Sequence, residues 1–422
     1  MNRIERKQSS NYKYWLLIIA SFLTYVILTA SKQLYIANKT TLFSLGIFGN
    51  LTDLATTFEY YFYSYAIMQI CLVFFIKKIN VKWFLTLTVG ASSILTVLMY
   101  FTTNINQHYL IYTANGLLQA GIWGGLFKNL SKYLPKNFLA RANGLMTSGP
   151  AVAFTLSYVI AALFGENWAL PFMVMGIALL ASIILYFVSV TAVSKNNVKI
   201  DTSNLSNILE NEDPLINLVS KKSKVAFLII SLIVGASINS VYYVLNNNLD
   251  FFLKEVGNFT NSQCKLITII ATIVTVIGPI ITVILCEKFR NFLLVGGYLF
   301  LLAFAILLPL TLFFETNIVF SIFLFMFFLV ITNGVRTLSL SVVALKERSV
   351  IDTGVYTTAV NAISSIAAGL APKGLAIILD NPMLTISQSW RLIFTIILIA
   401  TITLFIILVT FGYAVNKKKN KA

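Results

Sequence analysis

Long apolar blocks, separated by short polar breaks, dominate the pattern of this chain. About a dozen blocks of roughly twenty residues recur from Tyr14 onward, and a helix needs about 20 residues to cross a hydrocarbon core about 30 Å thick. Each block is therefore long enough to span a bilayer. We expect an all-α polytopic membrane protein with twelve transmembrane helices, at residues 14–36, 56–76, 83–101, 108–131, 142–164, 170–191, 225–247, 262–285, 291–313, 318–344, 352–377 and 390–413.

The overall composition points the same way. The chain is 58% hydrophobic and only 11% charged, and its mean hydropathy is +0.84. A soluble domain could not cover so much apolar surface, so the bilayer must be treated as the solvent. The first apolar run is too long for a cleavable signal peptide.

The longest polar break divides the chain into two halves. It runs from about Ser194 to Lys224 and is expected to be a cytoplasmic linker. We therefore expect an N-terminal six-helix bundle at 1–193, a linker at 194–224 and a C-terminal six-helix bundle at 225–422. The halves also repeat a motif, Asn115-Gly116 in the fourth span and Asn333-Gly334 in the tenth, which suggests duplication about an axis along the membrane normal.

The basic residues predict the orientation. The formal net charge is +16, and 24 of the 31 lysines and arginines fall in the termini and in alternate loops, on one side of the predicted spans. The positive-inside rule assigns that side, and both termini, to the cytoplasm. Because the charge is spread over loops beside spans, we expect attraction to anionic lipid and no nucleic-acid partner.

No enzymatic constellation is present in the sequence. We find no glycine-rich phosphate loop, no His–Cys metal cluster and no nucleophile–base pair, so we expect no catalytic residue, no metal and no cofactor. The three cysteines, Cys71, Cys264 and Cys286, lack metal-ligand spacing and are interpreted as packing residues. His108 and Glu59, near the ends of predicted spans, are expected at the membrane interface.

Arg336 is the sharpest candidate for a functional residue. It lies ten residues before Lys346, so it should sit roughly 15 Å inside the cytoplasmic end of the tenth span at about 1.5 Å per residue. A charge inside a membrane is costly and is by default a functional hypothesis. The alternatives are that Arg336 pairs with a carboxylate or with carbonyls between helices, or that it snorkels.

Polar and aromatic residues at helical spacing supply further candidates. Such stripes either line a cavity or hold helices together. Lys32 shares a face with Tyr25 in the first span, although snorkelling would also explain it. The candidate substrate-binding set is Lys32, Arg336, Tyr25, Tyr65, Gln69, Gln119, Trp123, Tyr243 and Asn246.

Several of these runs resemble one branch of the major facilitator superfamily, the organophosphate:phosphate antiporters, which carry glycerol-3-phosphate and hexose phosphates. The run Gly116-Leu-Leu-Gln119-Ala-Gly-Ile-Trp123 is similar to the branch pattern G-x-x-Q-G-x-G-W, and Phe252-Leu-Lys-Glu-Val256 is similar to Y-L-K-E-V. In the first span, Lys32 stands where the branch has an arginine.

The chain also departs from that branch. A second phosphate-binding arginine, in span seven of the branch, falls here at Tyr242 or Leu245. The span-two lysine aligns with Gln69 and the span-five histidine with Ala153. The usual G-x-x-x-D-[RK] loop after span two is reduced to Lys77-Lys78.

The resemblance implies a secondary active transporter of the plasma membrane, an antiporter whose two bundles rock about a midplane site. The placement of the charges, rather than the resemblance, suggests that Lys32 and the bidentate guanidinium of Arg336 hold the substrate, a small organic anion that is phosphorylated or carboxylate-bearing. A coupling anion or proton is expected as a partner, and the chain is expected to act as a monomer. The alternatives are a carrier of amino acids or other zwitterionic nutrients and a membrane sensor with a transporter fold.

Overall fold

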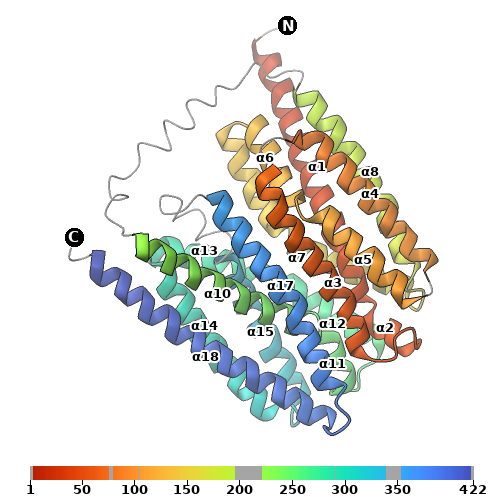
Figure 1. Cartoon of the computed structure of the whole chain (residues 1–422), viewed down its shortest axis with the longest axis vertical. Coiled ribbons are helices and arrows are strands. Elements are labelled where there is room, and N and C mark those ends of the chain that lie inside the picture. Colours follow the sequence, from red (N-terminus) through yellow and green to blue (C-terminus); the bar gives the residue numbers. More distant parts are fainter. Residues whose placement is uncertain are drawn as a thin grey trace. The chain divides into compact units, whose positions relative to one another are not determined.

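The computed structural model describes residues 3–75, 79–102, 104–194, 221–289, 291–338 and 353–419. Within these ranges the chain is helical and contains no β-strand (Figure 1). The first half contains α1 (Arg3–Ala37), α2 (Lys39–Ser44), α3 (Leu51–Phe75), α4 (Val81–Leu98), the 3-10 helix η1 (Met99–Phe101), α5 (Ile105–Gln119), α6 (Ile122–Tyr133), α7 (Lys136–Phe164) and α8 (Leu170–Ser194). The second half contains α10 (Lys221–Asn246), α11 (Leu249–Glu255), α12 (Asn261–Val274), α13 (Ile277–Phe289), α14 (Phe292–Phe313), α15 (Ile318–Thr337), α17 (Thr353–Leu379) and α18 (Ile386–Lys419).

These helices confirm the expected fold class. Among the described residues, nine helical stretches are long and apolar enough to cross a membrane. The other three predicted crossings, at 56–76, 108–131 and 225–247, correspond to α3, to α5 followed by α6, and to α10. The count of twelve is thus compatible with the structure, while most of the predicted linker, at 195–220, lies outside the described residues.

Short polar residues set several of the helix starts. Asn80, Asn104 and Asn317 each precede a helix, and their side-chain oxygens accept a bond from a backbone N–H of the first turn. Thr260 and Gln263 form a reciprocal capping box at the start of α12. Each cap satisfies a donor that the helix cannot, and is worth about 1 kcal/mol.

Two predicted spans are broken in the middle, and a side-chain amide meets a carbonyl at each break. Between α5 and α6, Gln69 Nε2 donates to the Ala120 carbonyl at 3.3 Å. Between α12 and α13, Asn333 Nδ2 donates to the Thr275 carbonyl at 3.1 Å. Gly121, at the first break, packs so closely that an added Cβ would lie 2.6 Å from Leu72. A freed carbonyl in a membrane must find such a partner.

The described chain forms two compact units. One comprises the described parts of Met1–Tyr35 and Ile67–Ser220, and the other those of Ile36–Ala66 and Lys221–Ala422. The second unit thus includes α2 and the first part of α3 together with the C-terminal helices. The prediction of two duplicated halves, 1–193 and 225–422, stays a prediction.

The first unit is held together by α1, α4 and α8 around a small apolar core. Leu17, Leu85 and Leu179 are fully buried in it. Thr24 Oγ1 donates to the Ser182 carbonyl of α8 at 3.1 Å, so α1 and α8 are also joined by a hydrogen bond. Close approach through small residues and interhelical hydrogen bonds is what stabilises helices in lipid.

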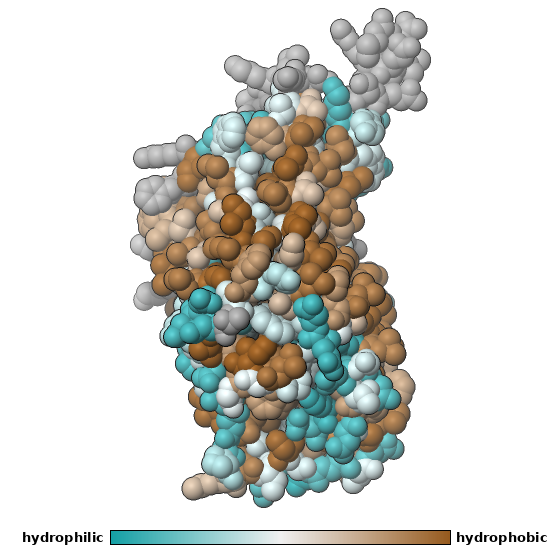
Figure 2. Space-filling model, turned by 90° about the vertical axis from the view of Figure 1, so that its right-hand side faces the viewer, coloured by the Kyte–Doolittle hydropathy of each residue, from teal (hydrophilic) through white to brown (hydrophobic). Residues whose placement is uncertain are grey.

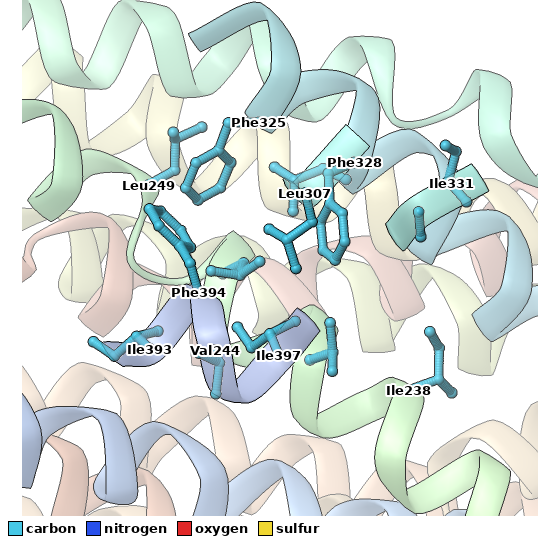
Figure 3. Packing of buried hydrophobic residues seen from close by; sticks show 14 of the residues in the cluster. Ile238, Val244, Leu249, Leu307, Phe325, Phe328, Ile331, Ile393, Phe394 and Ile397 are labelled. Carbon is cyan, nitrogen blue, oxygen red and sulfur yellow. The ribbon is translucent and has the colours of Figure 1, made fainter. Parts of the chain in front are cut away.

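The second unit has a core rich in aromatic residues. Figure 3 shows Phe325 of α15 near Phe394 of α18, and Phe328 of α15 beside Leu307 of α14. Phe252 of α11 joins this cluster, with its ring centroid 5.0 Å from that of Trp390. Aromatic pairs of this kind add about 0.5–1.5 kcal/mol each beyond the area they bury.

Large apolar side chains also cover the outside of the helices. Leu110 and Leu163 are 71% and 72% exposed, and Phe74 is 72% exposed. Figure 2 shows hydrophobic side chains over much of the visible surface. Such exposure fits a protein whose helices face lipid, and it would be a liability in water.

Candidate functional site

Arg336 is held in the second unit by two kinds of contact. Its Nε donates to Asn239 Oδ1 at 3.0 Å. Its guanidinium carbon lies 4.9 Å from the centre of the Tyr242 ring and 5.5 Å from that of Tyr243. A cation over an aromatic face is attracted by the ring quadrupole, so the two tyrosines and the asparagine fix the position of this charge.

The helices explain why these groups meet. Asn239, Tyr242 and Tyr243 lie three and four residues apart on α10, so they share one helix face. That face packs against the last turn of α15, which carries Arg336. Asn239 and Tyr242 are each 2% exposed and Arg336 is half-buried, so the cluster lies within the helix bundle of the unit.

The middle of α3 contributes further rings near this cluster. Phe62 lies 5.2 Å from Tyr243, centroid to centroid. Tyr61 and Tyr65 stack at 5.9 Å, and the Tyr65 hydroxyl is hydrogen-bonded to Asn361 of α17. The predicted residues Arg336, Tyr65 and Tyr243 are therefore gathered in one unit.

Asn246 lies one turn further along α10. It is 1% exposed, and its Nδ2 makes no hydrogen bond with any group in the described part of the chain. A buried donor without a partner costs free energy and is expected to meet a ligand or water at some stage. This position is consistent with its prediction as a polar group of the pocket.

The first unit gathers other predicted residues. The rings of Tyr25 and Trp123 lie 4.7 Å apart, and Trp123 continues the stack to Phe127 at 4.7 Å. Gly149 of α7 faces Tyr25 so closely that an added Cβ would lie 2.7 Å from that ring. Trp123, which ends the run similar to the antiporter pattern, thus belongs to a packed aromatic group with Tyr25 of α1 and Phe127 of α6. Gly149 of α7 lies against this group.

Two predicted amides have structural partners in this unit. Gln119 Nε2 donates to Ser92 Oγ at 2.9 Å, and that hydroxyl donates to Asn115 Oδ1 at 2.7 Å. Gln69 bonds the Ala120 carbonyl at the helix break described above. These contacts hold α3, α4 and α5 together. Polar stripes either line a cavity or hold helices together, and these two amides hold helices together.

Lys32 is half-buried near the end of α1. Its backbone carbonyl accepts a bond from the Tyr112 hydroxyl at 3.3 Å. The neighbouring turn carries Tyr35, whose hydroxyl shares a hydrogen bond with His108 Nδ1 at 3.0 Å. His108 is fully buried, and its imidazole packs against Tyr35 of α1 and against Trp168, which precedes α8. The expectation that it lies at the level of the membrane interface stays a prediction.

Sequence reasoning missed two ion pairs of the second unit. Lys39 Nζ lies 3.3 Å from Asp250 Oδ1, and Lys373 Nζ lies 2.5 Å from Glu59 Oε2. Glu59 is only 8% exposed and also accepts a bond from Tyr63, while its expected position at the membrane interface stays a prediction. Each of these charges, taken alone in the sequence, resembles an ordinary charge at the end of a span.

These side chains offer groups that can bind the polar parts of a solute. An arginine positioned on aromatic rings within a membrane bundle can bind an anion, and the nearby tyrosines and amides can bind hydroxyl or carbonyl groups. The described residues contain no cluster of His, Cys, Asp or Glu that could hold a metal ion. The nine long apolar helices among the described residues define a multi-pass membrane protein.

The comparisons with known proteins give the family. The family model described as Major Facilitator Superfamily matches residues 14–372. The chain therefore belongs to this superfamily of secondary transporters, which work by alternating access. The comparison with curated proteins found no match.

Solved structures share the fold at low sequence identity. The nucleoside transporter NupG is 14% identical, with a TM-score of 0.68 over 94% of this chain and 98% of its own. A bacterial homolog of the human lysosomal transporter Spinster, in an inward-facing and unoccupied conformation, is 14% identical, with a TM-score of 0.70 over 96% of both chains. A D-xylose–proton symporter is 12% identical, with a TM-score of 0.71 over 93% of this chain and 97% of its own.

Proposed function

We propose that this transporter carries a small organic anion and that Arg336 binds the anionic group. The observation that supports this is the placement of its guanidinium over Tyr242 and Tyr243 with Nε bonded to Asn239. A guanidinium fixed in this way presents its planar donors in one orientation, so a carboxylate or phosphate can be gripped bidentately.

Arg336 lies near the position of an arginine that the organophosphate antiporters have and this chain lacks. The organophosphate antiporters that the sequence resembles have an arginine in span seven, and here that slot falls at Tyr242 or Leu245. Arg336 comes from span ten, yet its charge lies against the Tyr242 ring. It therefore stands in for the missing arginine, with Lys32 as the second predicted cation.

The rest of the proposal follows from the sequence. Tyr65, Tyr243 and Asn246 shape the pocket beside Arg336, and Tyr25 and Trp123 do so in the first unit, where Gln69 and Gln119 hold the surrounding helices together. Antiport across the plasma membrane, cytoplasmic termini and a monomeric state are part of the same proposal. The nucleoside transporter and the D-xylose symporter share the fold while carrying other solutes, so the case for an anion depends on the residues and not on the fold.

Counterflow in proteoliposomes tests this proposal. Vesicles loaded with phosphate, a phosphorylated sugar, a dicarboxylate or an amino acid are diluted into the same labelled solute. We expect accumulation of a phosphorylated or carboxylated anion by the natural chain and none by Arg336→Ala. Exchange of amino acids alone would replace the organic anion with the zwitterionic alternative.

Arg336→Ala also separates binding from stability. Losing one charge-assisted contact costs on the order of 2–3 kcal/mol, roughly 30- to 150-fold in affinity. Arg336→Lys keeps the charge but not the fork, so partial activity is expected. An Arg336→Ala protein that binds anions normally but melts much earlier would show that the arginine is structural.

A further inference from the structure

Lys82, in the first turn of α4, is held against α8 by a hydroxyl group and an aromatic ring. Its Nζ donates to Thr191 Oγ1 at 2.6 Å and lies 3.8 Å from the centre of the Phe187 ring. Thr191 in turn donates to the Phe187 carbonyl at 2.6 Å, so the hydroxyl that orients the lysine is itself fixed on α8. A ring and a hydroxyl position an ammonium without neutralising it, and Thr191 accepts only one of its three donors. The charge of Lys82 is therefore available to an anion.

The helices around Lys82 offer it no counter-ion. From Val81 to Ser194 the sequence has five basic residues and a single acidic one, Glu166. Glu166 precedes the start of α8 and Thr191 lies near its end, so roughly 30 Å of helix separates them at about 1.5 Å per residue. An anion that pairs with Lys82 must come from outside these helices.

Lys82 lies where two membrane spans end. One span begins at Val81, one residue before Lys82, and the other ends at Ser194, three residues after Thr191. Trp83 is 52% exposed, and its ring lies 5.2 Å from that of Phe187. Tryptophan and lysine are typical of the headgroup level, where the indole lies at the boundary with the acyl chains and the ammonium reaches toward the phosphates.

The two helices run antiparallel along their whole length, side by side in Figure 1. At one end Lys82 meets Thr191, and toward the other end Gly176 packs so closely that an added Cβ would lie 2.5 Å from Val97. Residues of α4 one turn after Lys82 therefore lie level with residues of α8 one turn before Thr191.

Below the headgroup level, the outer face of this helix pair is apolar. Leu87 follows Trp83 by four residues and Ile184 precedes Phe187 by three, so each continues the helix face of its aromatic neighbour. Leu87 is 67% exposed and Ile184 is 57% exposed. A charged group at the surface thus stands above an exposed apolar strip, which is the pattern that a phospholipid presents in reverse.

We propose that Lys82, Trp83 and Phe187 bind the headgroup of an anionic phospholipid at this end of the α4–α8 pair. The lipid phosphate accepts from the remaining donors of Lys82, and an acyl chain lies over Leu87 and Ile184. A soluble phosphate would meet the charge and leave the apolar strip uncovered, so the lipid fits better. The orientation that the basic residues predict places the site in the cytoplasmic leaflet, where anionic lipids are concentrated.

Quenching of Trp83 fluorescence by brominated phospholipids tests this site in the whole protein. The other tryptophans are changed to phenylalanine, at Trp15, Trp123, Trp168 and Trp390. The chain is reconstituted in phosphatidylcholine with rising fractions of brominated phosphatidylglycerol, or of brominated phosphatidylcholine as the neutral comparison. We expect half-maximal quenching at about a fivefold lower mole fraction of the anionic lipid, the effect of one lysine near the membrane surface. If the chain with four substitutions does not fold, the difference between the natural chain and Trp83→Phe gives the same signal.

Two variants locate the preference. Lys82→Gln should abolish it, so that both brominated lipids quench Trp83 equally. Thr191→Val keeps the charge but removes the hydroxyl that orients it, and should retain part of the preference. Lys132→Gln is the matched control, because Lys132 is an exposed lysine near the end of α6 whose ammonium lies 5.1 Å from the Tyr133 ring. It should leave the preference of Trp83 for the anionic lipid unchanged.

The remaining outcomes overturn the proposal. Equal quenching by the two lipids in the natural chain, or a preference kept in Lys82→Gln, would exclude a headgroup site at Lys82. Equal losses in Lys82→Gln and Lys132→Gln would show only a diffuse attraction between the basic surface and the membrane. Relief of the quenching by inorganic phosphate would mean that a soluble anion occupies the site instead. Since no transport is measured, the result is independent of anion binding at Arg336.

Discussion

Arg336 of α15 lies with its guanidinium carbon 4.9 Å above the ring of Tyr242 of α10. In the antiporters that the sequence resembles, an arginine belongs near this place on span seven, and here an aromatic ring on that span supports an arginine from span ten. The ring attracts the cation without neutralising it, so the charge keeps its capacity to bind an anion. A carboxylate in place of Tyr242 would have removed that capacity.

The first prediction concerns this support. Tyr242→Phe keeps the ring face and should leave anion affinity within about twofold, whereas Tyr242→Leu loses a cation–π contact worth about 1–2 kcal/mol and should weaken binding by roughly 5- to 30-fold. Isothermal titration with the transported anion measures both. If the leucine variant bound as tightly as the phenylalanine variant, the ring would have no role in positioning Arg336.

The second prediction concerns Lys32. If it binds substrate, Lys32→Gln should reduce uptake strongly, whereas Lys13→Gln removes only a charge near the predicted cytoplasmic end of the same helix and should have little effect. A cysteine at position 32 should also be protected from a soluble thiol reagent by the bound anion. Equal, small losses in the two glutamine variants would favour snorkelling.

The sequence was sufficient to predict the fold because the thickness of the bilayer sets the length of each spanning helix. A crossing needs about 20 residues, and the apolar blocks were bounded by Asn, Lys and Gly at that spacing. The observed helices begin and end within a few residues of those blocks in most cases, for example Phe292–Phe313 against the predicted 291–313. The capping asparagines lie in the polar breaks themselves.

The sequence was not sufficient for contacts between distant helices. The breaks after Gln119 and Val274 interrupt apolar runs that read as continuous, because the partner amides, Gln69 and Asn333, lie on other helices. Lys39 and Asp250 each resembled a loop charge, and only the folded chain brings them together. Helical spacing did select Tyr243 and Asn246 of α10, but it did not show that Tyr242 would share the contact with Arg336.

The third prediction separates a structural from a substrate-binding role for Gln69. Its amide bonds the Ala120 carbonyl at the break between α5 and α6. Gln69→Leu should therefore lower the melting temperature, by an amount equivalent to roughly 0.5–1.5 kcal/mol, with anion affinity nearly unchanged. Loss of affinity without loss of stability would show that Gln69 binds the substrate instead.

The fourth prediction tests the orientation. In a chain without native cysteines, Ser203→Cys in the linker and Asn420→Cys in the tail should react with an impermeant maleimide only after the cells are opened. Asn104→Cys, which precedes α5 on the opposite predicted side, should react in intact cells. Labelling of Ser203→Cys or Asn420→Cys from outside would reverse the orientation that the basic residues predict.

The last prediction concerns the coupling free energy between Lys39 and Asp250. Because both side chains are buried, Lys39→Met or Asp250→Leu alone leaves an uncompensated charge and should cost about 3–5 kcal/mol of stability. The double variant replaces both charges with apolar groups, so its melting temperature should return close to that of the natural chain. The Glu315–Arg391 pair is the control, because its side chains are 42% and 56% exposed and Glu315→Gln should cost no more than about 1 kcal/mol. Losses that simply added in the double variant would mean that the two charges are not coupled.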